Sequence, residues 1–185
     1  MDSLRSKDAS VTLQVVGIVG FALLTAMGSQ VRIYLWEVPF TFQTLAVYGS
    51  GLFLGWRNGM LAQVLYLTIG LFLPVYAGGE FGLAFLMTGI TAGYLFGFPL
   101  AAFVSGLVST KWNGPIGSFL SLMAGSVVLF SIGVTWFHYI ADHSSWFESI
   151  DKGWLRFVGV DLAKILLVSM IYTGSRRLTT KKTSS

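Results

Sequence analysis

The sequence has no cysteine and few charged residues. Without a thiol, none of its 185 residues can contribute to a disulfide, a thiolate metal site or a cysteine nucleophile. Only 11% of the residues are Asp, Glu, Lys or Arg, whereas a soluble domain carries about 25%. Apolar residues make up 54% of the chain. Because so few charges could not cover the surface of a soluble protein, we expect lipid to surround most of the chain.

Signatures of common enzymes are also missing. The sequence contains no Gly-Lys-Ser or Gly-Lys-Thr, so it has no P-loop with which to hydrolyse ATP. It contains no Gly-x-Ser-x-Gly, the turn that carries many hydrolase nucleophiles. His138 and His143 lie near Asp142 and could hold a metal weakly, but exposed loop histidines explain them better. We expect no catalytic residues, no metal, no cofactor and no enzymatic activity.

The basic residues do not predict a nucleic-acid surface. The isoelectric point is near 9.5, but Lys and Arg lie at the chain ends and in short turns, with no basic stripe among exposed aromatics. That distribution suits a membrane protein, in which cytoplasmic segments collect Lys and Arg. A lipid bilayer, and no nucleic acid, is therefore the expected partner.

Long charge-free runs predict membrane-spanning helices. A helix needs about 20 mainly apolar residues to cross the hydrocarbon of a bilayer. Charge-free runs cover residues 9–31, 38–56, 58–79, 81–110 and 112–141. A sixth apolar segment, 154–174, is interrupted by Arg156, Asp161 and Lys164. The sequence thus predicts an all-α integral membrane protein with six transmembrane helices, at about residues 11–28, 43–56, 58–73, 88–109, 116–139 and 154–175.

Two stretches are expected to interrupt simple helices. Residues 55–59 read Gly-Trp-Arg-Asn-Gly, a composition typical of a tight turn between the second and third helices. The run 81–110 is too long for one upright span, and its glycines and Pro99 predict a short extra segment followed by a bend.

The distribution of Lys and Arg predicts the orientation. With both termini cytoplasmic, the inner side holds more of them than the outer side, which is the positive-inside bias. The inner set is Arg5, Lys7, Arg57, Lys111, Arg176, Arg177, Lys181 and Lys182, and the outer set is Arg32, Lys152 and Arg156. We expect a cytoplasmic N-terminal segment (1–10), a transmembrane domain (11–176) and a polar cytoplasmic tail (177–185), disordered over residues 179–185.

Asp161 and Lys164 lie about two turns inside the sixth predicted helix. A spacing of three residues puts both side chains on one helix face, within reach of each other. Each charge near the centre of a bilayer costs about 2.5–3.5 kcal/mol, so neither should face lipid. Since ionisable groups inside a membrane usually serve function, we expect the pair to bind a small polar solute. The alternative is a structural ion pair that fixes the rotation of this helix.

Two segments on the predicted outer side could close such a site. Pro39 disfavours a helix in residues 38–45, where Thr41 and Gln43 supply uncharged hydrogen-bonding groups. This segment is either an ordinary loop or one that dips into the bundle. Between the third and fourth helices, Gly78 and Gly79 permit close approach of the backbone to a ligand, although Gly-Gly also serves simple turns.

The first predicted helix carries small residues on one side. Ala22 and Ala26 are four positions apart, and glycines precede and follow them. Small residues at this spacing let another helix approach closely. Composition favours packing inside the bundle, and a docking face for a separate subunit is the alternative.

Several of these stretches together resemble a known family. They are residues 38–45 (VPFTFQTL), 51–55 (GLFLG), 73–79 (LPVYAGG) and 91–102 (TAGYLFGFPLAA), and the Asp-x-x-Lys of Asp161 and Lys164. Taken in order, they resemble BioY proteins, the biotin-specific substrate-binding subunits of energy-coupling-factor transporters.

This resemblance implies a six-helix protein of the cell membrane that captures biotin from outside. The ligand-binding residues that it implies are Asp161, Lys164, Thr41, Gln43, Tyr76, Gly78, Gly79 and Tyr94. It also implies that Ala22 and Ala26 dock a transmembrane coupling subunit, which connects to a pair of ATPases and would explain the missing P-loop. Some family members occur without dedicated partners.

The chemistry of biotin suits these residues. Its ureido ring offers two N–H donors and one carbonyl acceptor, beside an apolar bicycle and a carboxylate tail. Asp161 can accept from the N–H groups, and Lys164 can donate to a ligand oxygen. Phe40, Tyr76 and Tyr94 can enclose the bicycle. The sequence leaves open which polar group meets which end of biotin, and a transporter for another small vitamin is an alternative.

Overall fold

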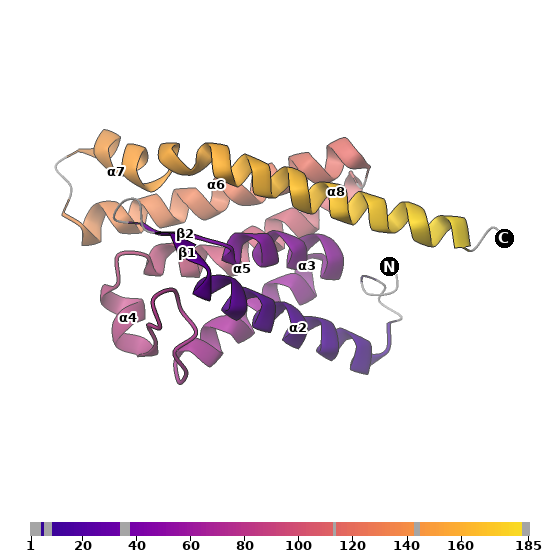
Figure 1. Ribbon diagram of the computed structural model, residues 1–185, viewed down its shortest axis with the longest axis horizontal. Helices are drawn as coiled ribbons and strands as arrows, with labels where there is room; N and C mark the ends of the chain where they lie inside the picture. Colours follow the sequence, from indigo (N-terminus) through magenta and orange to yellow (C-terminus); the bar gives the residue numbers. More distant parts are fainter. Residues whose placement is uncertain (1–4, 6–8, 34–37, 113, 143–144, 183–185) are drawn as a thin grey trace.

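The computed structural model describes residues 5, 9–33, 38–112, 114–142 and 145–182, and these are mainly helical (Figure 1). The α-helices are α2 (Val11–Gln30), α3 (Gln43–Gly70), α4 (Gly82–Thr88), α5 (Ala92–Lys111), α6 (Pro115–Ile140), α7 (Trp146–Gly153) and α8 (Val158–Lys182). A 3-10 helix, η1 (Leu155–Phe157), precedes α8, and the strands are β1 (Arg32–Ile33) and β2 (Phe40–Thr41). The predicted all-α class is confirmed, with the two short strands as an addition.

A sharp break at Gly55 divides α3 into two arms. The backbone of Gly55 has φ 78° and ψ 175°, a conformation that a residue with a Cβ rarely adopts. The arms pack closely against each other. A Cβ added to Gly59 on one arm would lie only 2.8 Å from the carbonyl oxygen of Ser50 on the other. Across the same interface, Nε2 of Gln63 donates to the Ser50 hydroxyl (3.1 Å). The predicted turn is confirmed, and the arms correspond to the second and third predicted helices.

The long run 81–110 is divided into α4 and α5, as its length predicts. The N–H of Gly89 donates to the carbonyl of Phe85 (2.7 Å) and ends α4. The indole N–H of Trp136, on α6, donates to the carbonyl of Gly89 (2.9 Å) and anchors the break. The helix predicted over 88–109 therefore begins later, at Ala92, and Pro99 lies inside it.

β1 and β2 form a short antiparallel hairpin beside the start of α3. Arg32 pairs with Thr41, and Ile33 pairs with Phe40. The non-helical backbone predicted around Pro39 is confirmed, because Pro39 directly precedes β2. The connecting residues 34–37 lie outside the described part of the chain.

The C-terminal third differs most from the prediction. The sequence does not predict α7, which begins where the Ser145 hydroxyl accepts the N–H of Glu148 (3.2 Å) as an N-cap. The last helix begins at Val158 rather than 154, because η1 occupies residues 155–157. It continues to Lys182 rather than ending near 175, so the expectation of a disordered tail is wrong as far as Lys182. Residues 183–185 lie outside the described residues.

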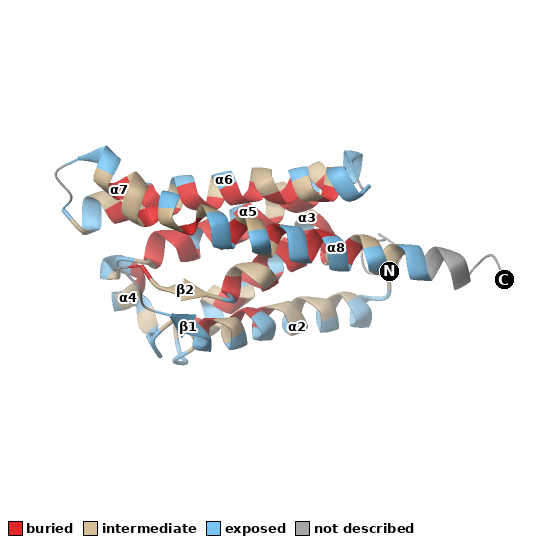
Figure 2. Ribbon diagram, turned by 45° about the horizontal axis from the view of Figure 1, so that its top comes forward, coloured by how far each residue is buried: buried red, intermediate tan, exposed pale blue. Residues whose placement is uncertain are grey.

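The long helices run side by side along the long axis of the molecule (Figure 1). α5 packs against α3 and α6, α2 packs against α3, and α8 packs against α6 and α3. α5 is therefore central, and it is largely buried (Figure 2). The hairpin, α4 and α7 lie at one end of the molecule, which we call the hairpin end.

The opposite end collects cations, and we call it the cationic end. The Arg5 guanidinium donates to the hydroxyls of Tyr172 on α8 (2.6 Å) and Ser109 on α5 (2.8 Å). It also lies beside the break in α3. Arg57 follows that break, and Lys111 is in the last turn of α5. Residues of the predicted inner set therefore gather at this end.

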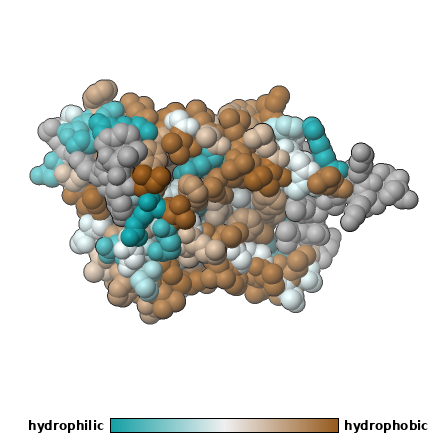
Figure 3. Space-filling model, viewed as in Figure 1, coloured by the Kyte–Doolittle hydropathy of each residue, from teal (hydrophilic) through white to brown (hydrophobic). Residues whose placement is uncertain are grey.

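The flank between the two ends is largely apolar (Figure 3). Large apolar side chains point outward from each long helix, including Met27 on α2, Leu100 on α5, Val127 on α6 and Met170 on α8. So wide an apolar surface is suited to lipid rather than water. Among the described helices, α2, α5 and α6 are long and apolar enough to cross a membrane by themselves.

Candidate functional site

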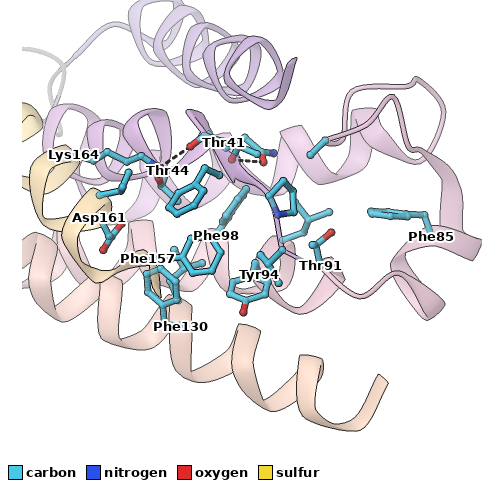
Figure 4. A pocket seen from close by; sticks show the side chains of 18 residues that line it. Thr41, Thr44, Phe85, Thr91, Tyr94, Phe98, Phe130, Phe157, Asp161 and Lys164 are labelled. Carbon is cyan, nitrogen blue, oxygen red and sulfur yellow. Dashed lines mark hydrogen bonds between the residues drawn. The ribbon is translucent and has the colours of Figure 1, made fainter. Parts of the chain in front are cut away.

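A cavity lies near the hairpin end, between the hairpin segment and helices α5, α6 and α8 (Figure 4). Its volume, measured as the space open to the centre of a water molecule, is about 70 Å³. Its lining residues are Val38, Pro39, Phe40, Thr41, Gln43, Thr44, Ala77, Phe85, Thr91, Tyr94, Leu95, Phe98, Leu129, Phe130, Phe157, Val160, Asp161 and Lys164. Of these described residues, Asp161 and Lys164 alone carry charge, so the cavity has one charged end.

The Asp161 carboxylate is held by hydroxyl groups from two other helices. The Tyr48 hydroxyl, on α3, donates to Oδ1 (2.7 Å), and the Ser126 hydroxyl, on α6, donates to Oδ2 (2.5 Å). Asp161 is 6% exposed, so these two donors replace much of the water that a carboxylate would otherwise bind. Each oxygen of a carboxylate can accept about two hydrogen bonds, so capacity for a ligand donor is left on both.

Lys164 reaches in another direction, toward the hairpin and the start of α3 (Figure 4). Its Nζ donates to the backbone carbonyl of Thr41 (2.7 Å) and to the Thr44 hydroxyl (3.0 Å). A lysine ammonium has three N–H donors, so one is left for a ligand oxygen at the cavity. Lys164 also ties the hairpin to α8.

Asp161 and Lys164 do not form the ion pair that their spacing predicts. Among the described residues, Asp161 is bonded to Tyr48 and Ser126, whereas Lys164 is bonded to Thr41 and Thr44. The reason is that partners on other elements satisfy each charge separately, so the two side chains diverge. The interpretation of a direct ion pair that orients the helix is therefore wrong, although both residues line one cavity.

Aromatic rings form the walls beside the charged end. The rings of Phe40 and Phe157 have centroids 4.5 Å apart, and Phe130 lies 6.3 Å from Phe157. Phe130 also stacks on Trp154, at 5.6 Å and an interplanar angle of 2°. These contacts hold flat apolar surfaces in place, as a pocket for an apolar ring system requires.

Thr41 and Gln43 both line the cavity, and they are linked by hydrogen bonds. The Thr41 hydroxyl donates to Oε1 of Gln43 (3.0 Å), and Nε2 of Gln43 donates to the Tyr66 hydroxyl (2.6 Å). Tyr66 in turn donates to the carbonyl of Val75 (3.1 Å), in the segment before α4. This chain of bonds connects the hairpin, α3 and that segment at the cavity mouth. That Thr41 and Gln43 contact a ligand stays a prediction.

Tyr94 also lines the cavity, through its ring. Its hydroxyl donates to the carbonyl of Gly153 (2.8 Å), at the end of α7. The ring packs edge-on against Phe130, with centroids 6.1 Å apart. Tyr94 therefore presents an apolar face to the cavity, and its polar end is already bonded to protein.

The structure does not bring Tyr76, Gly78 or Gly79 to the cavity lining, where Ala77 lies instead. The Tyr76 side chain is fully buried and donates to the carbonyl of Leu67 (2.7 Å). Burial raises the pKa of the Tyr76 hydroxyl to about 12, so it stays a donor. Gly78 and Gly79 have φ values of 96° and 76°, which glycine adopts without strain. These residues shape the segment that places Ala77 in the cavity lining.

Sequence reasoning missed much of the site. Tyr48 and Ser126 hold Asp161, and Phe98, Phe130 and Phe157 line the cavity. Phe98 lies in a stretch that resembles the family, which was a usable signal. Ser126 and Phe130 sit in the long apolar helix α6, and Phe157 lies in η1 beside Arg156. Nothing in the sequence around these positions marks a side chain that meets the site rather than lipid.

The docking role expected of Ala22 is not supported. Ala22 is fully buried and belongs to the core, while Ala26 is half-buried against it. On α2, the buried side consists of Ala22, Thr25 and Ser29, and Thr25 bonds to Gln63 of α3 (3.2 Å). Ala22 is therefore packed within the bundle, which is the interpretation that composition favours, and docking through Ala26 stays a prediction. A partner approaching α2 would meet its larger exposed side chains instead.

The His138 ring contacts neighbouring side chains. Its Nδ1 lies 2.9 Å from the Ser149 hydroxyl, and its ring stacks on Trp146 at 4.0 Å. Within the described part of the chain, no three His, Asp or Glu residues are grouped so that they could hold a metal ion. His143, the other residue of the weak metal interpretation, lies outside the described residues.

Comparison with known sequences settles the family. The sequence pattern of the BioY family matches residues 3–181. The chain belongs to the BioY family. The relative named "Biotin transporter BioY" from Thermotoga maritima is 34% identical over 159 residues, which cover 85% of this chain and 92% of that relative. The "Probable biotin transporter BioY" of Lysinibacillus sphaericus is 33% identical over 173 residues, covering 87% of each chain. The resemblance drawn from the motifs is confirmed.

A solved structure supports the fold of this BioY family member. The crystal structure of the S-component for biotin from an ECF-type ABC transporter superposes with a TM-score of 0.82. The match covers 93% of this chain and 95% of that chain, at 20% sequence identity. At this identity the similarity establishes the common fold, and the site must be argued from the residues themselves.

Proposed function

We propose that this BioY family member binds biotin in the cavity between the hairpin, α5, α6 and α8, and that it delivers biotin for import. The observation that carries the proposal is the cavity's charged end: Asp161 and Lys164 both line the cavity, and each bonds to partners other than the other. Each therefore has hydrogen-bonding capacity to offer a ligand. The relatives named as biotin transporters support biotin as that ligand.

The shape and chemistry of biotin match this arrangement. Its ureido N–H groups can donate to Asp161, and a ureido or carboxylate oxygen can accept from Lys164. Its apolar bicycle can pack against the wall that rings such as Phe40, Phe130 and Phe157 form. The same cavity offers neither a nucleophile with a base nor a metal cluster among its described residues, which fits a binding protein better than an enzyme.

The topology proposed for the chain is six membrane passes with both termini in the cytoplasm. α2, α5, α6 and α8 supply four passes, and the two arms of α3 supply the others. The cationic end would then face the cytoplasm, in keeping with the positive-inside rule. The cavity, at the hairpin end, would open to the outside. Lys7, which belongs to the predicted inner set, lies outside the described residues.

The sequence has no P-loop, so any ATP hydrolysis by that route that powers import must take place in other subunits. We propose that a separate transmembrane coupling subunit and a pair of ATPases supply the energy for import, as the ECF-type similarity suggests. α2 offers an exposed apolar side toward such a subunit, with Leu23, Leu24 and Met27 about half exposed or more.

The proposal is tested by biotin uptake in cells that can neither make nor import biotin. Cells that produce this protein together with a coupling subunit and ATPases are expected to accumulate labelled biotin and to grow on traces of it. Cells with the coupling subunit and ATPases alone are the control. Uptake no greater than in the control would overturn the transport proposal. Equal uptake without the coupling subunit and ATPases would overturn the proposed energy source.

A further inference from the structure

Three helices converge on one buried carboxylate. Asp161 on α8 accepts hydrogen bonds from Tyr48 on α3 (2.7 Å) and Ser126 on α6 (2.5 Å). Tyr48 is 0% exposed and Ser126 is 5% exposed. Neither residue lines the cavity, whereas Asp161 does. The two hydroxyls are therefore in a position to act on a ligand only through the carboxylate.

We propose that Tyr48 and Ser126 are positioning residues that hold the Asp161 carboxylate in the orientation in which it receives the N–H donors of the ligand. This inference rests on the proposed function, because it assumes that Asp161 contacts biotin. It adds two residues that contribute to ligand affinity without touching the ligand.

The geometry explains why two donors are needed. One hydroxyl donates to each oxygen, so the carboxylate cannot turn about its last bond without losing a hydrogen bond. A site that is held in its bound geometry loses less entropy when the ligand arrives. If either hydroxyl were removed, one oxygen would lose the only donor that the described residues give it, in an environment with little water.

Charge explains why these donors are hydroxyl groups rather than cations. An Arg or Lys bonded to Asp161 would neutralise the carboxylate and compete with the ligand for it. A Tyr or Ser hydroxyl fixes the carboxylate while leaving its charge available. Lys164, which could neutralise Asp161, is instead held away by Thr41 and Thr44. The arrangement keeps a negative acceptor beside a positive donor in one cavity.

The test compares substitutions that differ by a single hydroxyl. Tyr48→Phe removes only an oxygen and is expected to weaken biotin binding by about 10-fold. Ser126→Thr and Ser126→Val have nearly the same shape, so any packing defect is common to both. Ser126→Val is expected to bind about 10-fold more weakly than Ser126→Thr. Titration of each purified variant with biotin measures these ratios, and thermal unfolding checks that each is folded.

Two other positions on α8 provide matched controls. Tyr172 is 2% exposed and its hydroxyl bonds to Arg5 at the cationic end, so Tyr172→Phe makes the same chemical change away from the site. Ser169 is 5% exposed and bonds to the carbonyl of Pro115 (3.3 Å). Tyr172→Phe and Ser169→Val are expected to leave biotin affinity within about 2-fold of the unmodified protein.

The outcomes separate this inference from the proposed function. If the unmodified protein binds biotin and both Tyr48→Phe and the Ser126 pair behave as expected, the inference holds. Equal affinity of Ser126→Thr and Ser126→Val, or unchanged affinity of a folded Tyr48→Phe variant, would overturn it while the proposed function stands. If the unmodified protein does not bind biotin, the proposed function fails first.

Discussion

Replacing Lys164 by alanine is expected to weaken biotin binding by about 100-fold, which corresponds to roughly 3 kcal/mol. The substitution removes the one cation among the cavity's described residues, and with it the N–H group that would donate to a ligand oxygen. It also releases the Thr41 carbonyl and the Thr44 hydroxyl, so the hairpin loses its bond to α8. Asp161→Asn is expected to weaken binding by a similar factor, because it replaces a charged acceptor by a neutral one.

Titration of the purified variants with biotin measures both effects. Lys152→Ala is a matched control, because it removes the same charge from α7, where Lys152 pairs with Glu148 (2.8 Å) outside the cavity. The control is expected to bind biotin as the unmodified protein does. If folded Lys164→Ala and Asp161→Asn variants bound biotin with unchanged affinity, the site would lie elsewhere.

Replacing Gly106 by alanine is expected to destabilise the protein by about 3 kcal/mol. Gly106 lies where α5 crosses the break in α3, and an added Cβ would stand 2.5 Å from Cα of Trp56 and 2.8 Å from the carbonyl carbon of Gly55. Backbone atoms cannot rotate out of the way as a side chain can, so the two helices must separate. That separation would also disturb the contact between Arg5 and the Gly106 carbonyl (3.3 Å).

Thermal unfolding in detergent measures this loss, which corresponds to a fall in Tm of roughly 6–12 °C. Gly20→Ala, on α2, is the control, because an added Cβ there has nothing within 4 Å. Alanine also favours a helix more than glycine does, so the control is expected to be as stable as the unmodified protein or slightly more so. An equal Tm for Gly106→Ala and the unmodified protein would show that α5 and α3 are less tightly packed than described.

The sequence predicted the helical framework well, because a helix that crosses the hydrocarbon of a bilayer needs a long apolar run. Charge-free runs mark most of the long helices to within a few residues, and Gly55 marks the break in α3. The hairpin and α7 could not be predicted in the same way. Each is short, and each depends on local hydrogen bonds such as the cap at Ser145 rather than on hydrophobic length.

Asp161 and Lys164 were recognisable from sequence, because charges in an apolar helix are conspicuous. Their actual partners were not, since Tyr48 and Ser126 lie 113 and 35 positions away from Asp161 along the chain. Helical spacing predicts which residues share a face, but it does not predict which neighbouring helix offers a better partner. The expected ion pair was wrong for that reason.

The sequence also could not predict which side of α2 faces the bundle. A pair of small residues four apart is compatible both with packing inside a bundle, which composition favours, and with docking a partner outside it. The hydroxyls of Thr25 and Ser29 show which side of α2 faces the bundle, because they bond inward to Gln63 and to the carbonyl of Val75. Ala22 shares their side of the helix and is buried with them.

Titration of the purified, unmodified protein with biotin, beside thiamine and riboflavin, tests the central claim most directly. The cavity has a separate acceptor and donor, Asp161 and Lys164, beside aromatic walls. This arrangement predicts saturable binding of biotin to one site per chain. Thiamine and riboflavin are expected to bind far more weakly and not to displace biotin. Absence of saturable biotin binding, or tighter binding of either other vitamin, would contradict the claim.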